Sequence, residues 1–313
     1  MVVTGAGGFV GQEACAALLR AGHPVRALAR HNFTLPKVQT SGFTVTVVED
    51  LAETDRLEAL LAGADAVVHL AARVHRTSES PSFAAHLYDR DVQMTKRLAL
   101  AAHRAGVRRL VYLSSIKALA DRSAGALART AVPNPVDPYG RSKLAAEREL
   151  AVISASTGLQ VVVVRPPLVY GARASANFRQ LVRWIRRGVP LPFAKVQNRR
   201  SIVSVDNLAS FIVRCVGPVA ETFSIFHVSD PQAVSTPELL RYVATGLEVR
   251  ARLFSVPTRV LESLCVLTGR SDIAVRLLMS LELETEDSYS ALAWRPGSST
   301  REGILRAVRD MRR

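Results

Sequence analysis

The first two thirds of the chain alternate short apolar runs with amphipathic stretches. The apolar runs predict strands at residues 2–4, 25–29, 44–48, 66–70, 109–114 and 161–165. Each run is nearly all apolar, as strands buried on both faces of a sheet are. The amphipathic stretches predict helices at residues 12–21, 55–61, 94–105 and 141–157. Strands that alternate with helices in this way indicate a parallel, doubly wound α/β sheet.

The alternation loosens after Gly171. Residues 177–188 predict an amphipathic helix, and Ser235 predicts the start of another, with a proline in its first turn. Beyond that helix the pattern indicates further helices around a smaller lobe. We therefore expect one domain over residues 1–170, with a return segment near residues 200–230, and mainly a second lobe over residues 171–313.

The formal charge of +14 is high for a chain of 313 residues, of which 48% are hydrophobic and 22% charged. Basic residues cluster at positions 108–109, 183–187, 199–200 and 312–313. No recognised nucleic-acid motif accompanies the charge, so we expect no nucleic-acid partner. The charge instead favours polyanionic small ligands and a loose association with an anionic membrane surface.

The cysteines and histidines argue against two common kinds of site. The three cysteines are far apart and odd in number, which is not the pattern of a disulfide framework or a zinc site. The seven histidines have no metal-ligand spacing, so we expect no metal. No apolar stretch reaches the roughly 18 residues of a membrane helix. With no signal peptide before the first strand, we expect a cytoplasmic protein without an integral membrane segment.

A glycine-rich turn follows the first strand. Gly5, Gly8 and Gly11 are three residues apart, and Phe9 and Val10 lead into the predicted helix. Glycines let a strand turn sharply and let backbone N–H groups approach a pyrophosphate at the positive end of the helix dipole. The turn therefore predicts a Rossmann-like dinucleotide site, with a glycine-rich turn that binds no cofactor as the alternative.

The end of the second strand bears on the choice of cofactor. NAD-binding folds of this type usually carry an acid there for the ribose 2′-hydroxyl. This chain has Ala29 followed by Arg30, and a guanidinium can fork onto a phosphate. The sequence thus favours NADP(H), with NAD(H) as the alternative if Arg30 is only a solvated strand end.

Two further strand ends are candidates for cofactor contacts. Asp50, followed by Leu51, comes after the third strand, where an acid can accept from an adenine amino group or cap the next helix. Leu70, Ala71 and Ala72 end the fourth strand, where small residues leave room for a cofactor or simply pack.

Ser115, Tyr139 and Lys143 carry the candidate chemistry. Ser115, next to Ser114, ends the fifth strand, where open α/β sheets bind ligands. Tyr139 and Lys143 lie one helical turn apart and share a face. An ammonium beside a phenol favours the phenolate, so we expect a pKa for Tyr139 below the usual value of about 10. Such a tyrosine can exchange a proton with a carbinol oxygen while a nicotinamide carries the hydride.

The chain resembles the extended short-chain dehydrogenase/reductase family of sugar-nucleotide epimerases, dehydratases and reductases. The resemblance rests on segments that occur in the order TGAGGFVG, HLAA, LSS, DPYGRSK, RPPLVYG and LAWRPG. The resemblance covers nearly the whole chain and implies that residues 1–170 bind NAD(P) and that the second lobe binds substrate. It implies that Ser115 orients the substrate oxygen, Tyr139 is the acid/base, and Lys143 holds the nicotinamide ribose. The other residues it implies are Pro166, Pro167 and Leu168 for the nicotinamide, and Asn177, Arg200 (or Arg199) and Arg276 for the substrate diphosphate.

Within the family, the chain is most similar to bacterial UDP-N-acetylquinovosamine dehydrogenases, also described as 4-reductases of UDP-4-keto-6-deoxy-N-acetylglucosamine. The segments that carry this similarity are SSIK, NPVDPYGRSK, RPPLVYG, ANF and NRRSIV. This similarity implies a UDP-sugar substrate and a role in O-antigen and lipopolysaccharide synthesis. The family also implies a homodimer, formed through the helices predicted at residues 94–105 and 141–157.

One replacement narrows the reaction. The family's 4,6-dehydratases have an Asp-Glu pair where this chain has Ile116 and Lys117. Elimination needs two proton-transfer groups, and Ile116 cannot transfer a proton. Net reduction at C4 is therefore the first hypothesis. A 4-epimerase with tightly held NAD and a non-catalytic NAD(P)-binding relative are the alternatives.

Two departures from the family pattern affect the surroundings of the site. Asp91 stands where an asparagine is usual, and a buried charge there would need a partner, for which Arg90 is the candidate. Residues 118–120 are Ala-Leu-Ala instead of Val-Tyr-Gly, so we expect a substrate specificity of the chain's own.

Overall fold

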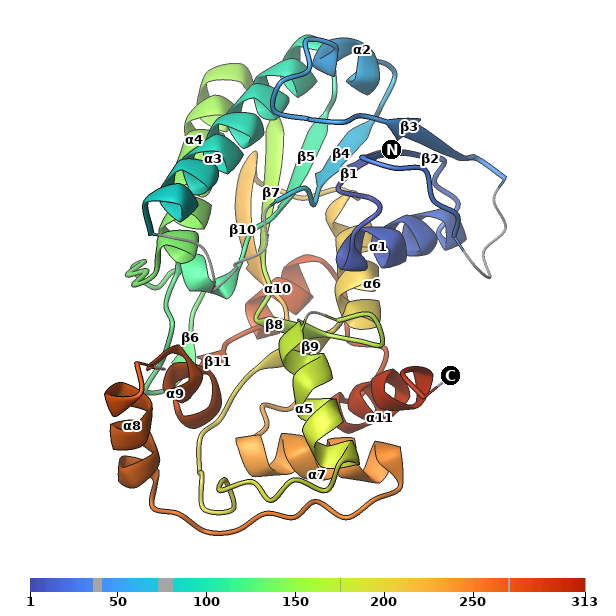
Figure 1. The fold of residues 1–313 in the computed structure, drawn as a ribbon. Helices are drawn as coiled ribbons and strands as arrows, with labels where there is room; N and C mark the ends of the chain where they lie inside the picture. The colour runs from blue at the N-terminus through green and yellow to red at the C-terminus, as the bar shows by residue number, and fades with distance from the viewer. Residues whose placement is uncertain (36–40, 73–80, 175, 270, 313) are drawn as a thin grey trace.

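Seven parallel strands form one sheet at the centre of the upper part of the molecule (Figure 1). The computed structural model describes residues 1–35, 41–72, 81–174, 176–269 and 271–312. The strands are β1 (Val2–Thr4), β2 (Val25–Ala29), β3 (Phe43–Val47), β4 (Ala66–His69), β5 (Arg109–Leu113), β7 (Gln160–Arg165) and β10 (Phe223–His227). Their order is β10-β7-β5-β4-β1-β2-β3, and every neighbouring pair is parallel. The predicted doubly wound α/β sheet is confirmed.

The direction in which the sheet grows reverses at β1. From β1 the chain adds β2 and β3 on one side, and then places β4 on the other side of β1. Val2 accordingly pairs with Arg26 of β2 and with Val67 of β4. At such a reversal the loops that leave the strand ends part to opposite faces, and ligands bind in the crevice between them. The glycine turn after β1 lies at this point.

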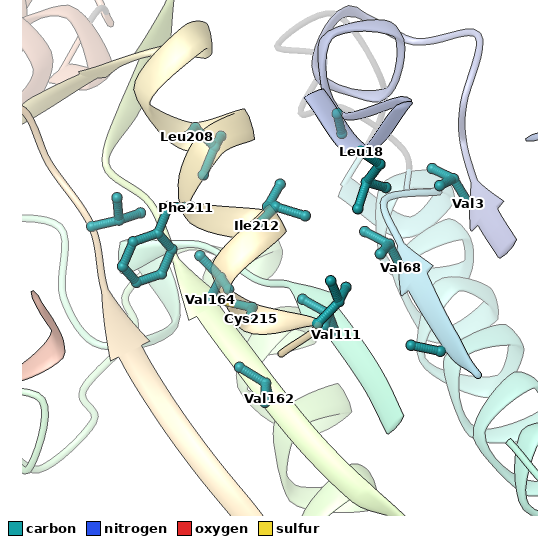
Figure 2. Packing of buried hydrophobic residues seen from close by; sticks show 14 of the residues in the cluster. Val3, Leu18, Val68, Val111, Val162, Val164, Leu208, Phe211, Ile212 and Cys215 are labelled. Carbon is teal, nitrogen blue, oxygen red and sulfur yellow. The ribbon is translucent and has the colours of Figure 1, made fainter. Parts of the chain in front are cut away.

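Helices cover both faces of the sheet (Figure 1). α1 (Phe9–Arg20) and α6 (Val205–Cys215) cover one face, and α2 (Leu57–Leu61), α3 (Pro81–Arg104) and α4 (Pro138–Thr157) cover the other. Because successive strand residues point to opposite faces, Val162 joins the core that contains Phe211, which Figure 2 shows, whereas Val161 joins the core that contains Leu150. This explains why consecutive positions of the central strands are apolar, as at residues 161–164 of β7.

A second set of elements packs below the carboxyl ends of the strands. α5 (Ala176–Arg186), α7 (Thr236–Leu247) and α11 (Thr300–Asp310) share a core that includes Phe178, Leu240 and Ile304. Ser235 caps α7, as predicted, in a capping box with Glu238. The remaining elements are η1 (Ile116–Ala118), β6 (Ala126–Leu127) paired with β11 (Glu282–Leu283), β8 (Leu168–Tyr170) paired with β9 (Ile202–Ser204), α8 (Thr258–Leu267), α9 (Ser271–Leu278) and α10 (Glu286–Ala291).

The observed elements differ from the expected ones mainly at helix starts. α4 begins at Pro138 rather than at residue 141, because Asp137 caps the helix and the proline takes its first position. α3 begins at Pro81, well before residue 94, and buries Leu87 and Val92 in a stretch that is polar overall. The sheet also has a seventh strand, β10, within the expected return segment. The domain division at residue 170 stays a prediction.

Candidate active site

The glycine turn brings β1, β4 and α1 into close contact. Gly5 has φ +66°, and a Cβ on it would lie 2.6 Å from the backbone N of Ala71. A Cβ on Gly11 would lie 2.2 Å from the Gly5 carbonyl oxygen. Gly8 is the N-cap of α1, and no side chain caps this helix end, so the N–H groups of Phe9 and its neighbours face the turn. The turn therefore has the geometry of an anion cradle.

Other predicted cofactor segments lie at the same edge of the sheet. Arg30 follows β2 and is exposed. Leu70 to Ala72 follow β4, and the Ala71 N–H donates to Thr4 Oγ1 at 3.4 Å. The sequence contains no acid from Arg30 to Val48, so none stands at the end of β2 where a ribose 2′-hydroxyl would be held.

Asp50 pairs with Arg90 across the loop that follows β3. Arg90 Nη2 lies 2.6 Å from Asp50 Oδ2 and 2.9 Å from Glu53 Oε1. The prediction that Arg90 pairs with Asp91 is therefore wrong, because successive residues of a helix point to different sides. These two ion pairs instead fasten α3 to the loop after β3.

The sequence left two roles open for Asp50, an adenine contact and a cap of the next helix. The helix-cap alternative is wrong, because α2 begins at Leu57 with Arg56 as its N-cap. The Asp50 carboxylate instead accepts from the Ala52 N–H at 2.9 Å, which closes a local turn. Leu51, next to it, is half-buried against the core under α2 and α3. An adenine contact by this loop stays a prediction.

Ser115, Tyr139 and Lys143 come together beyond the carboxyl end of β5. Ser115 is the second residue after this strand and caps η1, and its Oγ accepts from the Lys117 N–H at 3.2 Å. Tyr139 is the second residue of α4 and shares a side-chain hydrogen bond with Ser115. Lys143 is one turn further along, with its Nζ 5.9 Å from the centroid of the Tyr139 ring. The two hydroxyls and the ammonium thus face one small space.

The ammonium of Lys143 is held by β5. Lys143 is buried, and its Nζ donates to the Leu113 carbonyl and to the Tyr112 hydroxyl, each at 3.2 Å. Burial lowers the pKa of Lys143 to about 8, while the charges of Asp91 and Glu147 act in the opposite direction. The pKa of Lys143 is therefore well below that of an exposed lysine.

The pKa of Tyr139 moves in the opposite direction to the one expected. Burial raises the pKa of Tyr139 to about 12, the hydrogen bond with Ser115 opposes the rise, and the charge of Asp137 adds to it. The expectation took account of Lys143 alone. In the folded chain, removal of the phenol from water disfavours the phenolate by more than the hydrogen bond with Ser115 favours it. Tyr139 is therefore a neutral phenol at physiological pH in this structure.

Lys117 joins the Ser115 loop to the start of the tyrosine helix. Its Nζ is 3.0 Å from Asp121 Oδ1 and also pairs with Asp137, the N-cap of α4. A Cβ on Gly140 would lie 2.3 Å from the Lys117 carbonyl oxygen, so the two segments approach at backbone distance. Lys117 thus contacts both segments that hold the reactive hydroxyls, a role that only the folded structure reveals.

A buried ionic network lies one turn beyond Lys143. Glu147 accepts from Arg165 at 2.9 Å (Nε) and 2.5 Å (Nη2), and from Ser114 Oγ at 2.5 Å. The side chains of Glu147 and Arg165 are 3% and 2% exposed. The network fastens α4 to the ends of β5 and β7. Its signal in the sequence is the four-residue spacing from Lys143 to Glu147, which puts Glu147 on the buried face of α4.

The nicotinamide and diphosphate candidates lie around the same opening. The Pro166 carbonyl accepts from the Ile116 N–H at 2.9 Å, which places Pro166 and Pro167 beside the Ser115 loop, and Leu168 begins β8. Asn177 lies in the first turn of α5, and its side chain is outside the described part of the structure.

Arg200 and Arg276 lie near each other. Burial and then the charge of Arg276 lower the pKa of Arg200 to about 10. Arg200 Nη1 also donates to the carbonyls of Val275 and Met279, at 2.9 and 2.8 Å, near the end of α9. Arg199 is instead exposed and forms a two-pronged pair with Glu282. Two guanidiniums that repel each other in a partly buried place suit an anionic ligand.

The described residues hold neither a candidate metal site nor a candidate membrane span. No group of three or more His, Cys, Asp or Glu side chains there could hold a metal ion. Likewise, no helix in the described ranges is long and apolar enough to cross a membrane.

Comparison with known proteins gives matches along most of the chain. The model of the NAD dependent epimerase/dehydratase family matches residues 1–225. A UDP-glucose 4-epimerase of Vibrio cholerae is 34% identical over 310 residues, which are 97% of this chain and 93% of that protein. An Escherichia coli O157:H7 protein named N-acetyl-alpha-D-glucosaminyl-diphospho-ditrans,octacis-undecaprenol 4-epimerase is 28% identical over 261 residues, with 82% and 75% covered.

A solved structure gives the same fold. The UDP-glucuronic acid 4-epimerase of Bacillus cereus, in complex with NAD, superposes with a TM-score of 0.78 at 20% identity, covering 99% of this chain and 97% of its own. At this identity the likeness supports the fold alone.

Proposed function

Because the chain belongs to the NAD dependent epimerase/dehydratase family, we propose that it is an NAD(P)-dependent oxidoreductase acting at C4 of a UDP-hexose, and that its net reaction reduces a UDP-4-keto-6-deoxy-hexose. The sugar we propose is the N-acetylated one. The observation that carries the proposal is the set of Ser115, Tyr139 and Lys143, with Tyr139 a neutral phenol hydrogen-bonded to Ser115.

The protonation state of Tyr139 favours reduction over oxidation as the first step. A ketone that accepts a hydride at C4 becomes an alkoxide, and a neutral phenol can donate the proton that this oxygen needs. Ser115 stabilises the developing charge by a second hydrogen bond. A bound reduced nicotinamide supplies the hydride. With a pKa of about 12, Tyr139 is in the donating form at neutral pH.

The residues around the glycine turn fit a dinucleotide. The backbone at Gly8 and Phe9 is free of side-chain caps and would hold the pyrophosphate, and Lys143 would hold the nicotinamide ribose. We propose NADP(H) rather than NAD(H), because the end of β2 offers an exposed guanidinium, Arg30, and no carboxylate. A fork of N–H donors recognises a 2′-phosphate, whereas a carboxylate would repel it.

Elimination of water is disfavoured by what surrounds Ile116 and Lys117. The Ile116 side chain is buried against Leu281 and has no exchangeable proton. The Lys117 ammonium is occupied by Asp121 and Asp137. Neither residue is therefore available as the second proton-transfer group that a 4,6-dehydratase uses.

The diphosphate of the substrate would lie between Arg200 and Arg276. The backbones of Arg200 and Leu281 pair in an isolated β-bridge, and Leu281 packs against Ile116. These contacts connect the diphosphate region to the Ser115 loop. Binding energy gained at the diphosphate, remote from C4, can hold the sugar against the nicotinamide.

A second candidate function is 4-epimerisation of a UDP-hexose. It is favoured by the 34% identity with the Vibrio cholerae protein, which is named a UDP-glucose 4-epimerase. The same three residues would serve, but the reaction begins with oxidation of a C4 hydroxyl, so Tyr139 would have to act first as a base. Its cofactor would also have to stay bound through the cycle.

One experiment tests both candidates. Purified protein is incubated with NADPH and enzymatically prepared UDP-4-keto-6-deoxy-N-acetylglucosamine, and the absorbance of reduced nicotinamide is followed together with the mass of the sugar nucleotide. Reduction predicts stoichiometric loss of absorbance and a product heavier by two hydrogens. If the protein instead carries bound NAD and interconverts UDP-glucose and UDP-galactose without added cofactor, the second candidate replaces the first. Activity in neither assay would overturn both.

A further inference from the structure

α8 has an apolar flank that the fold of this chain does not bury. Val260, Leu264 and Leu267 are 47%, 52% and 84% exposed. Their spacing of four and three residues puts them in one row along the helix. Another side of α8 faces the lobe, where Leu261 is buried with Leu278 of α9. α8 therefore has two apolar sides, and the second faces solvent.

The segment that leads into α8 continues this exposed apolar surface. It runs from the end of α7 along the lower edge of the molecule to α8 (Figure 1). Val249 and Phe254 lie on it, with 41% and 49% of their side chains exposed. Residues 249–267 hold more than half of the exposed large apolar side chains found in the described residues. Such grouping marks an interaction surface rather than scattered exposure.

Arginines surround this surface. Arg250, Arg252 and Arg259 are exposed, and Glu262 is the one acidic residue in residues 249–267. The end of α5, which lies at the same lower part of the molecule in Figure 1, adds exposed Arg186. The sequence has no acidic residue between Glu149 and Asp206. The partner that this charge complements is anionic.

We propose that the α8 surface, residues 249–267, docks on an anionic lipid bilayer, with Val260, Leu264 and Leu267 at the boundary of headgroups and acyl chains and the arginines on lipid phosphates. Short apolar rows with flanking basic residues bind bilayer interfaces in this way, without spanning them. A second copy of the chain fits less well, because a two-fold interface would bring the same arginines face to face. The proposal concerns location and is independent of the reaction proposed above.

The test is co-sedimentation of the full chain with vesicles of phosphatidylcholine alone and of phosphatidylcholine mixed with phosphatidylglycerol. We expect binding to the mixed vesicles only, weakening as salt is added. Leu264→Glu combined with Leu267→Glu should weaken binding about tenfold or more. Arg259→Gln should weaken it less, while Arg20→Gln, on α1, should have no effect.

Val132→Glu is the matched control, because Val132 is 87% exposed and lies outside the α8 surface. An equal loss in Val132→Glu and Leu267→Glu would overturn the proposal, as would equal binding to both vesicle types or to neither. A concentration-dependent dimer that Leu267→Glu dissociates would show that a second copy covers the surface. Leu267→Trp provides a second readout, since its fluorescence should shift to the blue on mixed vesicles only.

Discussion

Burial and the charge of Asp137 raise the pKa of Tyr139, whereas its hydrogen bond with Ser115 lowers it. We expect Tyr139→Phe to lower turnover about a hundredfold or more, because the variant keeps the ring but has no proton to donate. Cofactor affinity should stay near the wild-type value, because Lys143 keeps its bonds to Tyr112 and to the Leu113 carbonyl. The measurements are steady-state NADPH oxidation and a fluorescence titration with cofactor. Unchanged turnover would remove Tyr139 from the reaction.

Asp91 sets part of the charge around Lys143. Its carboxylate raises the pKa of Lys143, which burial lowers to about 8. In Asp91→Asn the pKa of Lys143 should fall further, so the ammonium is lost at a lower pH. We therefore expect the alkaline limb of the pH–rate profile to move to lower pH, with turnover little changed on the acid side. Asp89→Asn, an exposed acid on the same helix, is the control, and an equal shift in both variants would contradict a local effect.

The sequence allowed the proximity of the candidate residues to be predicted, but not the direction in which the pKa of Tyr139 shifts. A spacing of four residues is enough to put Tyr139 and Lys143 on one face of α4. Desolvation depends on which other elements close over a side chain, and here these include Tyr88 of α3, whose ring lies 6.0 Å from that of Tyr139. Because α3 is distant in sequence, no local pattern could have given the high pKa of the phenol.

At the scale of elements, the position of α4 relative to the Ser115 loop decides whether the two hydroxyls meet. Lys117 connects them through Asp137 and through its backbone contact with Gly140. We expect Lys117→Met to lower kcat about tenfold or more with a smaller change in KM, because a shift of about 1 Å in a reacting group is costly. Lys117→Arg should restore part of the rate. A variant that loses stability without losing kcat would indicate a purely structural role.

The buried pair of Glu147 and Arg165 should matter for stability in a way that a surface pair does not. Glu147→Gln leaves the Arg165 charge without its carboxylate, and we expect a loss of about 3–5 kcal/mol in the free energy of unfolding. Glu149→Gln, on the same helix, breaks an exposed pair with Lys96 and should cost at most about 1 kcal/mol. Urea denaturation at neutral pH compares the two, and equal losses would contradict the distinction.

Elements that are buried on both faces were the ones that the sequence pattern predicted best. β1, β2 and β7 are buried on both faces, so their apolar runs marked them within a residue of their true ends. β10 lies at the edge of the sheet and includes Ser224, which makes its pattern weaker. The pattern does not predict the first half of α3, because the charged run at residues 89–91 interrupts its apolar positions between Leu87 and Val92; Arg90 of this run pairs with the distant loop after β3.

At the scale of the whole molecule, the candidate residues for the cofactor and those for the substrate diphosphate come from different parts of the fold. The cofactor segments follow the strands of the sheet, whereas Arg200 and Arg276 belong to the lower elements. The sequence could not choose between Arg199 and Arg200, because both lie in one short segment. The fold separates them by pairing exposed Arg199 with Glu282 and by placing half-buried Arg200 next to Arg276.

Because the two sets of residues belong to different elements, we expect that a substitution can weaken binding of the UDP-sugar without weakening binding of the cofactor. Arg276→Gln should raise KM for the UDP-sugar about tenfold to a hundredfold, because it removes the charge-assisted hydrogen bond that we propose to the diphosphate, and should change kcat less. In thermal shift measurements UDP should stabilise this variant less than it stabilises the wild type, whereas NADPH should stabilise both equally. Arg199→Gln is the matched control, since its guanidinium is engaged by Glu282 at the surface. If Arg199→Gln loses the response to UDP and Arg276→Gln keeps it, the diphosphate is held at the surface, and the half-buried arginine pair serves only to close the end of α9.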